Sequence, residues 1–164
     1  MGSSRDERLR DLAHRYVPEV AKYLHRRSYP LPSDEIDDLV EEVLVVTWRR
    51  LDDAPVGREL PWMIGIARNV LNNARRKHSQ RASLNLKVEP RAPHPSAEDQ
   101  MIAEEQLRVA LARLSNRDRE ALLLTYWEGL DIEGLARVLS ISTNAASVRL
   151  SRASSRLRAD IEGT

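Results

Sequence analysis

Near its C-terminal end the chain has a run of residues that suits contact with nucleic-acid bases. The run consists of Thr143, Asn144, Ser147, Val148, Arg149, Ser151, Arg152 and Arg156. Amide and hydroxyl side chains can hydrogen-bond base edges in a DNA major groove, and arginines bind guanine or phosphate. Val148 has no hydrogen-bonding group but can touch a thymine methyl. The pattern indicates a DNA recognition helix. The alternative is a plain amphipathic hairpin with an arginine-rich solvated face.

A second group of amides and cations occupies the middle of the chain. It comprises Arg68, Asn69, Asn72, Asn73, Arg75, Arg76 and Lys77, and no acid lies between residues 62 and 81. The amides can read base edges, whereas the cations bind phosphates, which position a protein without specifying sequence. The competing interpretation is that these asparagines are ordinary helix-surface residues of weak helix propensity.

Acidic residues are concentrated elsewhere, so the net charge of +1 hides a segregation of charge. Residues 34–53 contain eight acids against two arginines, whereas residues 137–158 contain five arginines and no acid. Two basic segments and one acidic segment predict two nucleic-acid contacts and one further partner. Taken alone, the acidic segment is also compatible with a solvated helix face.

Several classes of function find no support in the sequence. There is no cysteine, and the four histidines are scattered without metal-ligand spacing. No nucleophile–base pair or phosphate-binding loop is present, so we expect neither an enzyme nor a cofactor. No apolar run is long enough to span a bilayer, and the first residues lack a signal-peptide core. We therefore expect a cytoplasmic protein with no membrane insertion of its own.

Hydrophobic spacing predicts helices that would position these groups. We expect them at 5–27, 35–51, 62–80, 116–128, 131–139 and 143–161, with a further one before Leu114. Pro18 predicts a kink or break in the first helix. Capping residues are expected at Ser33 or Asp34, at Ser115 and at Asp131.

The expected fold is all-α, with two small helical domains joined by a flexible, proline-containing linker. The first domain covers 5–78, the linker 79–97 and the second domain 98–161. Pro90, Pro93 and Pro95 mark the linker. In the second domain, the helices at 131–139 and 143–161 are separated by a short turn, as in a helix-turn-helix. Ser140 occupies a position in this turn that favours glycine.

Three motifs in this order resemble the extracytoplasmic-function (ECF) sigma factors of the sigma-70 family. Residues 37–49 (DDLVEEVLVVTWR) and 60–77 (LPWMIGIARNVLNNARRK) are similar to region two of that family. Residues 114–136 (LSNRDREALLLTYWEGLDIEGLA) and 142–153 (STNAASVRLSRA) are similar to region four. The resemblance covers about residues 8–161. The extra domain of larger sigma factors has no room here, which favours the ECF group.

The resemblance implies a function in transcription initiation, in which the chain directs core RNA polymerase to promoter DNA. The helix at 35–51 would bind core polymerase, through Asp37, Asp38, Leu39, Glu41, Glu42 and Val43. The helix at 62–80 would read the −10 element, with Asn69 holding a flipped base, and the recognition helix would bind the −35 element. An anti-sigma factor is a further partner that the family implies. Ser147 and Val148 depart from the family pattern, as does the loop at 52–59.

Three other functions compete with this interpretation. A stand-alone helix-turn-helix regulator would bind a palindromic site as a dimer, but it would not explain the acidic helix or the asparagine-bearing one. An adaptor would bind polymerase without reading promoters, and reversing the charge of Arg149 and Arg152 would leave its activity intact. An enzyme has no support from residue types.

Overall fold

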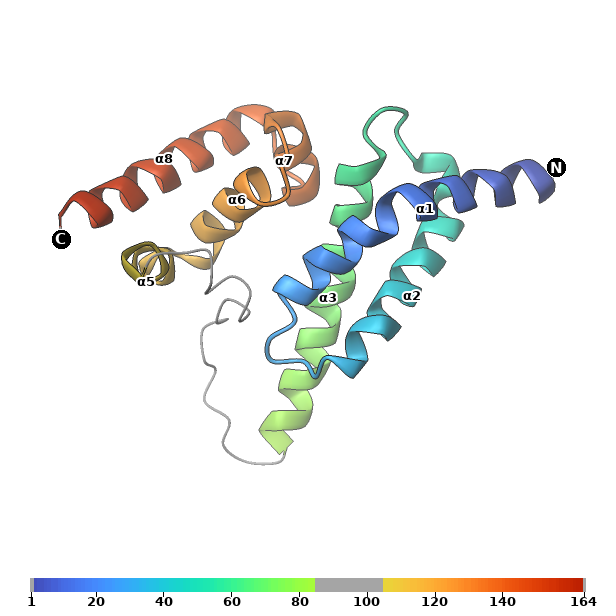
Figure 1. Cartoon of the computed structure of the whole chain (residues 1–164), viewed down its shortest axis with the longest axis horizontal. Helices are drawn as coiled ribbons and strands as arrows, with labels where there is room; N and C mark the ends of the chain where they lie inside the picture. The colour runs from blue at the N-terminus through green and yellow to red at the C-terminus, as the bar shows by residue number, and fades with distance from the viewer. Residues whose placement is uncertain (1, 85–104, 164) are drawn as a thin grey trace. The chain divides into compact units, whose positions relative to one another are not determined.

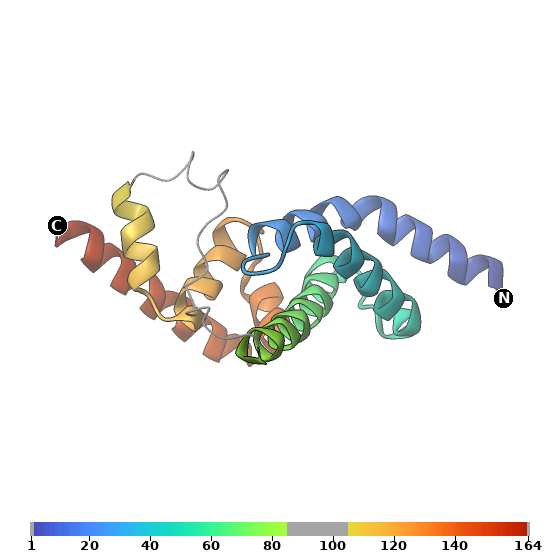
Figure 2. The same ribbon diagram turned by 90° about the horizontal axis from the view of Figure 1, so that it is seen from below.

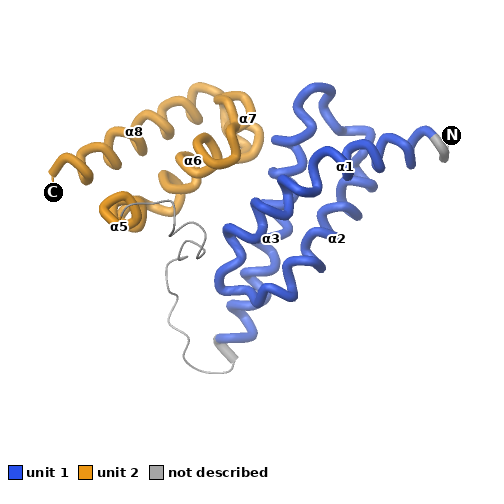
Figure 3. The backbone as a smooth tube through the Cα atoms, viewed as in Figure 1, with its two compact units in different colours: residues 1–94 blue, residues 95–164 orange. Residues whose placement is uncertain are grey.

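The computed structural model describes residues 2–84 and 105–163, which belong to two compact units. The first unit covers 1–94 and the second 95–164 (Figure 3). Across the described residues every regular element is a helix, as the sequence predicts. No helix in this part of the chain is both long enough and apolar enough to cross a membrane.

The first unit is built from three helices that pack on one another (Figure 1). They are α1 (Gly2–Arg26), α2 (Asp34–Arg49) and α3 (Glu59–Leu84), with a short 3₁₀ turn, η1 (Leu51–Asp53), after α2. Each helix contributes residues at three- and four-residue spacing to one core. The most deeply buried are Val20, Tyr23, Leu24, Ile36, Val43, Met63, Ile64, Ala67 and Leu71.

Two local predictions in the first unit, a break at Pro18 and a side-chain cap at Ser33, are wrong. Helix α1 continues through Pro18 without a break, because this proline is exposed and the rest of the helix packs on α2 and α3. Ser33 precedes α2 in a helical conformation and makes no side-chain cap hydrogen bond. Its backbone carbonyl instead accepts from the N–H of Ile36 at 3.3 Å, as in a turn.

Helix α3 is longer than predicted at both ends. It begins at Glu59 and continues to Leu84, so residues 79–84, which the sequence analysis placed in the linker, are helical. These residues have no proline or glycine, and nothing in them stops a helix once α3 has begun. The rest of the expected linker, 85–97, lies outside the described residues. So does the start of the second domain at 98.

The second unit contains α5 (Glu105–Arg113), α6 (Asn116–Tyr126), α7 (Ile132–Leu139) and α8 (Thr143–Glu162). The other three helices all pack against α8, and α5 crosses it rather than running alongside (Figure 2). Leu114, Leu122 and Ala153 form a buried cluster, against which Leu111, Leu150 and Leu157 pack. On α6, Tyr126 is 71% exposed, whereas Leu124 is fully buried.

The predicted caps of the second unit are present. Ser115 accepts from the N–H of Asp118 at 3.2 Å, and Asp131 accepts from Gly134 at 2.8 Å. Ser140 has φ 55° and ψ 44°, the left-handed conformation that the turn requires. The N–H of Ile141 donates to Ala136 at 3.0 Å across this turn. These bonds fix the chain direction between α7 and α8.

Candidate nucleic-acid interface

The asparagines of α3 lie together on the solvent side of the helix. Asn69, Asn72, Asn73 and Arg76 are exposed, and at about 100° per residue they share the face opposite the buried Ala67. Lys77 is also exposed, on the flank of this face. The face therefore presents three amides and a guanidinium within two helical turns, a composition suited to base edges and phosphates.

Arg75 is not part of this face, which corrects the sequence prediction. Its guanidinium donates to the backbone carbonyl of Arg27, just after the end of α1. Arg27 in turn stacks on the ring of Tyr23, with its guanidinium carbon 4.2 Å from the ring centre. Arg75 thus ties α3 to the end of α1. Arg68 lies two turns earlier in α3, on the same side of the helix as Arg75, and is half-buried.

The acids predicted on α2 are accessible. Asp37, Asp38, Glu41 and Glu42 are all exposed. Leu39 and Val43, which were expected to join them, are only 6% and 1% exposed and belong to the core, so this part of the prediction is wrong. They face inward because their spacing matches Ile36 and Thr47, the other buried residues of α2.

Val45 is the apolar residue that α2 does expose, and the sequence analysis missed it. It is 46% exposed and lies on the same side as Asp38 and Glu41, at the four- and seven-residue spacing of one helix face. Val45 interrupts the regular apolar pattern of α2, which is a signal that could have separated it from the core positions. The exposed side of α2 thus combines carboxylates with one apolar side chain.

The recognition-helix residues of α8 are also largely exposed. The exposed ones are Thr143, Asn144, Ser147, Val148, Ser151 and Arg152, whereas Arg149 is half-buried. Ala146 and Ala153 are fully buried on the opposite side, where their small size lets α8 approach α6 and α7 closely. Ser142 caps the helix by accepting from the N–H of Ala145 at 3.0 Å.

Arg156 was predicted to bind DNA, but it makes an ion pair within the unit. Its guanidinium lies 2.6 Å from a carboxylate oxygen of Asp118, whose side chain is 11% exposed. A buried carboxylate needs a partner, and removing the partner costs more than the pair contributes. Arg156 therefore holds α8 against the first turn of α6.

Arg119, which is half-buried, makes a second side-chain link that the sequence did not reveal. It donates to the carbonyls of Leu111, Ala112 and Leu114 at 2.8, 3.2 and 2.9 Å. These carbonyls lie in the last turn of α5 and just after it, where carbonyl groups lack the usual helical partner four residues on. Burial lowers the pKa of Arg119 below its usual value. From the sequence, the position of Arg119 four residues after the Ser115 cap indicates only that Arg119 lies near the start of α6. It does not reveal that the side chain binds the carbonyls at the end of α5.

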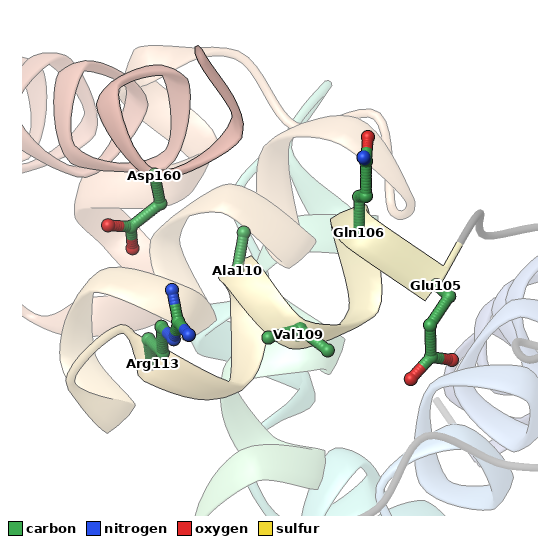
Figure 4. Close-up of a pocket in the computed structure, with 6 residues that line it drawn as sticks. All are labelled: Glu105, Gln106, Val109, Ala110, Arg113 and Asp160. Carbon is green, nitrogen blue, oxygen red and sulfur yellow. The ribbon is translucent and has the colours of Figure 1, made fainter. Parts of the chain in front are cut away.

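A small hollow in the second unit lies away from the recognition-helix residues. This pocket of about 150 Å³ lies between α5 and Asp160 of α8 (Figure 4). Its lining includes Val109 and Ala110 from one side of α5. Asp160 lies near the far end of α8 from Asn144, about 24 Å away by helical rise. Among the described residues, no cluster of acids and histidines could hold a metal ion.

Comparison with known proteins supports two modules. A model of sigma-70 region 2 matches residues 12–81, and one of sigma-70 region 4 matches residues 104–157. The sigma factor CnrH of Cupriavidus metallidurans is 30% identical over 81% of this chain and 76% of its own length. The ECF sigma factor EcfG of Rhodopseudomonas palustris is 29% identical over 77% of this chain and 71% of its own.

Two further similarities concern overall length and fold. A probable sigma factor, RfaY of Xanthomonas campestris, is 33% identical over 76% of this chain, which spans only 34% of RfaY. The fold resembles that of the sigma factor RpoE in its complex with the anti-sigma factor NepR from Bartonella quintana. The TM-score is 0.64 at 24% identity, covering 93% of this chain and 96% of RpoE. The chain belongs to the ECF sigma factors of the sigma-70 family.

Proposed function

We propose that this chain directs core RNA polymerase to specific promoters through three separate surfaces. The exposed side of α2 binds the polymerase, the asparagine face of α3 reads the −10 element, and the first turns of α8 read the −35 element. The chain catalyses no reaction itself and acts in the cytoplasm, where the polymerase is. The observation that carries this proposal is the sorting of exposed side chains by type onto these three helices.

The polymerase surface is supported by the side chains that α2 leaves accessible. Asp38 and Glu41 flank Val45 on one side of the helix, and all three are exposed. An apolar centre with a charged rim is the usual composition of a protein interface. A basic surface with a small apolar contact would complement it. The residues of this surface all belong to α2, so they do not overlap the residues of α3 and α8 that we propose to contact DNA.

The −10 surface is supported by the exposed amides of α3. A base that leaves its stack costs a few kcal/mol, which hydrogen bonds and nearby positive charge must offset. Asn69 and Asn73 can supply the hydrogen bonds, and Arg76 the charge, from the same face. Asn69 also matches the family position that helps to hold a flipped non-template base.

We further propose regulation by an anti-sigma factor. RpoE was solved in complex with the anti-sigma factor NepR, and CnrH was solved in complex with the cytosolic domain of CnrY. An anti-sigma factor that covered Asp38 or Val45 would block polymerase binding by competition.

In vitro transcription tests the proposal. Core polymerase with this chain is incubated with a genomic library and the start sites are mapped; we expect a small set of sites with shared −10 and −35 elements. The Asn69→Ala variant should weaken promoter opening, measured by permanganate reactivity of unpaired thymines. If it changes nothing while Arg152→Ala does, the −10 assignment is wrong.

Charge reversal tests the polymerase surface with a matched control. The Asp38→Lys variant should bind core polymerase at least tenfold more weakly in a fluorescence titration, because like charges at an interface cost several kcal/mol. Asp6→Lys makes the same charge change at an exposed position of α1, and this variant should bind core polymerase normally. Equal binding by both variants would move the interface away from α2. Promoter binding by the chain alone, as a dimer, would instead favour a stand-alone regulator.

A further inference from the structure

An apolar side chain stands in the middle of the polar face of α8. Val148 is 40% exposed and lies on the side of the helix opposite Ala146, which is fully buried. Its neighbours on the solvent side, one turn away in either direction, are Asn144 and Ser151, both exposed. The exposed surface of the first turns therefore consists mostly of groups that form hydrogen bonds; Val148 and the smaller Ala145 are the apolar exceptions, and Val148 is the large one.

The position of Val148 along α8 places it within reach of bases. It lies in the second turn of the helix that follows the α7–α8 turn, and the first turns of such a helix contact base edges. That turn is held by the Ile141 to Ala136 hydrogen bond at 3.0 Å and by the Ser142 cap at 3.0 Å. The orientation of Val148 is thus defined before DNA binds.

The chemistry of the major groove gives an apolar side chain one favourable partner. Thymine is the base that presents a methyl group there; the others present amino, carbonyl or ring-nitrogen groups. Valine against the thymine methyl removes apolar surface from water on both sides. Valine against an amino or carbonyl group would desolvate a polar atom without replacing its hydrogen bond.

From these observations we propose that Val148 is a specificity-determining residue that selects a thymine, through its C5 methyl, at one position of the −35 element. This inference rests on the proposed function, in which α8 reads that element. Asn144 and Ser151 bond to neighbouring base edges and set the register, and Val148 discriminates by the presence or absence of one methyl group.

Removal of single methyl groups from the DNA tests the inference. Once transcription mapping has identified a promoter, each thymine of its −35 element is replaced in turn by deoxyuridine, on either strand. Binding of the polymerase holoenzyme is then measured. We expect one replacement to weaken binding about fourfold, the effect of one buried methyl at about 0.8 kcal/mol. At the same position, cytosine should bind more weakly than thymine, and 5-methylcytosine should recover part of the loss.

Two variants identify the residue responsible. In the Val148→Ala holoenzyme the critical deoxyuridine should have almost no effect, whereas Asn144→Ala should bind more weakly overall yet keep the full sensitivity to it. Thermal unfolding should show that Val148→Ala is folded, since an exposed helical valine tolerates alanine. The inference is overturned if no thymine is sensitive, or if Val148→Ala retains the sensitivity. If a scrambled −35 element binds and initiates as well as the native one, the proposed function of α8 fails and the inference fails with it.

Discussion

Replacement of Ser140 by glycine should stabilise the second unit. Ser140 adopts φ 55° and ψ 44°, and it is exposed. For a residue with a Cβ atom, this left-handed conformation destabilises the folded state by about 1–2 kcal/mol, and glycine avoids that cost. Glycine gains freedom in the unfolded chain, which offsets about 0.4–1 kcal/mol. The backbone hydrogen bonds of the turn are unaffected. Taking the middle of each range, the net gain in the free energy of unfolding is about 0.8 kcal/mol.

For a domain of this size, a change of 1 kcal/mol moves Tm by about 4–8 °C, so Ser140→Gly should raise Tm by about 3–6 °C. Scanning calorimetry of the whole chain measures the shift. Hydrogen exchange of the α7 amides assigns the shift to the second unit. Ser140→Ala is the matched control: it keeps the unfavourable conformation and should give no increase. The reasoning is refuted if Ser140→Gly and Ser140→Ala have the same Tm, or if the glycine variant unfolds earlier.

Three other substitutions test the internal contacts. Arg119→Lys removes most of the hydrogen bonds that close α5 and should cost about 2 kcal/mol in urea unfolding, whereas Arg117→Lys on the exposed side of α6 should cost almost nothing. Arg75→Ala should lower the stability of the first unit by about 1 kcal/mol, whereas Arg76→Ala should leave stability unchanged and weaken holoenzyme binding to promoter DNA. Asp118→Asn should destabilise the second unit by about 1 kcal/mol, and the loss should be smaller at high salt because salt screens the ion pair. Thermal unfolding at two ionic strengths measures both effects.

Much of the fold follows from local patterns in the sequence. The spacing of Ile66 and Val70 correctly predicts the buried side of α3, and Ala146 and Ala153 mark that of α8. Ser115 and Asp131 are identifiable as caps because hydroxyl or carboxylate groups precede each helix. The turn marks Ser140 as a position that favours glycine, and the structure shows that Ser140 adopts the left-handed conformation there. In each case, interactions between residues a few positions apart decide the outcome.

The wrong predictions concern choices that depend on distant parts of the chain. Leu122, Leu123 and Leu124 are consecutive, so they cannot all face one core, and the position of α8 decides among them. Leu39 and Val43 were assigned to a surface on the basis of family resemblance, although their spacing fits the core. In general, a long apolar run on a helix leaves the boundary between core and surface to tertiary packing.

Long cationic side chains were equally difficult to place. Arg75 and Arg156 have the same residue type and a similar local context to the exposed Arg76 and Arg152, yet they bind a carbonyl and a carboxylate of their own unit. An arginine reaches several ångströms in any direction, so its partner is determined by which acceptors the fold brings near. Sequence alone can count such charges but cannot assign them.

The engagement of Arg75 and Arg156 within their own units also affects how the chain responds to ionic strength. Each cation that neutralises a phosphate of duplex DNA releases bound counterions and adds about −0.9 to the slope of log affinity against log salt concentration. Two arginines that keep their protein acceptors when the chain binds DNA would not take part in that release. The slope measured in a salt titration of promoter binding should therefore be less negative, by nearly two units, than the slope expected from a count of the basic residues along α3 and α8.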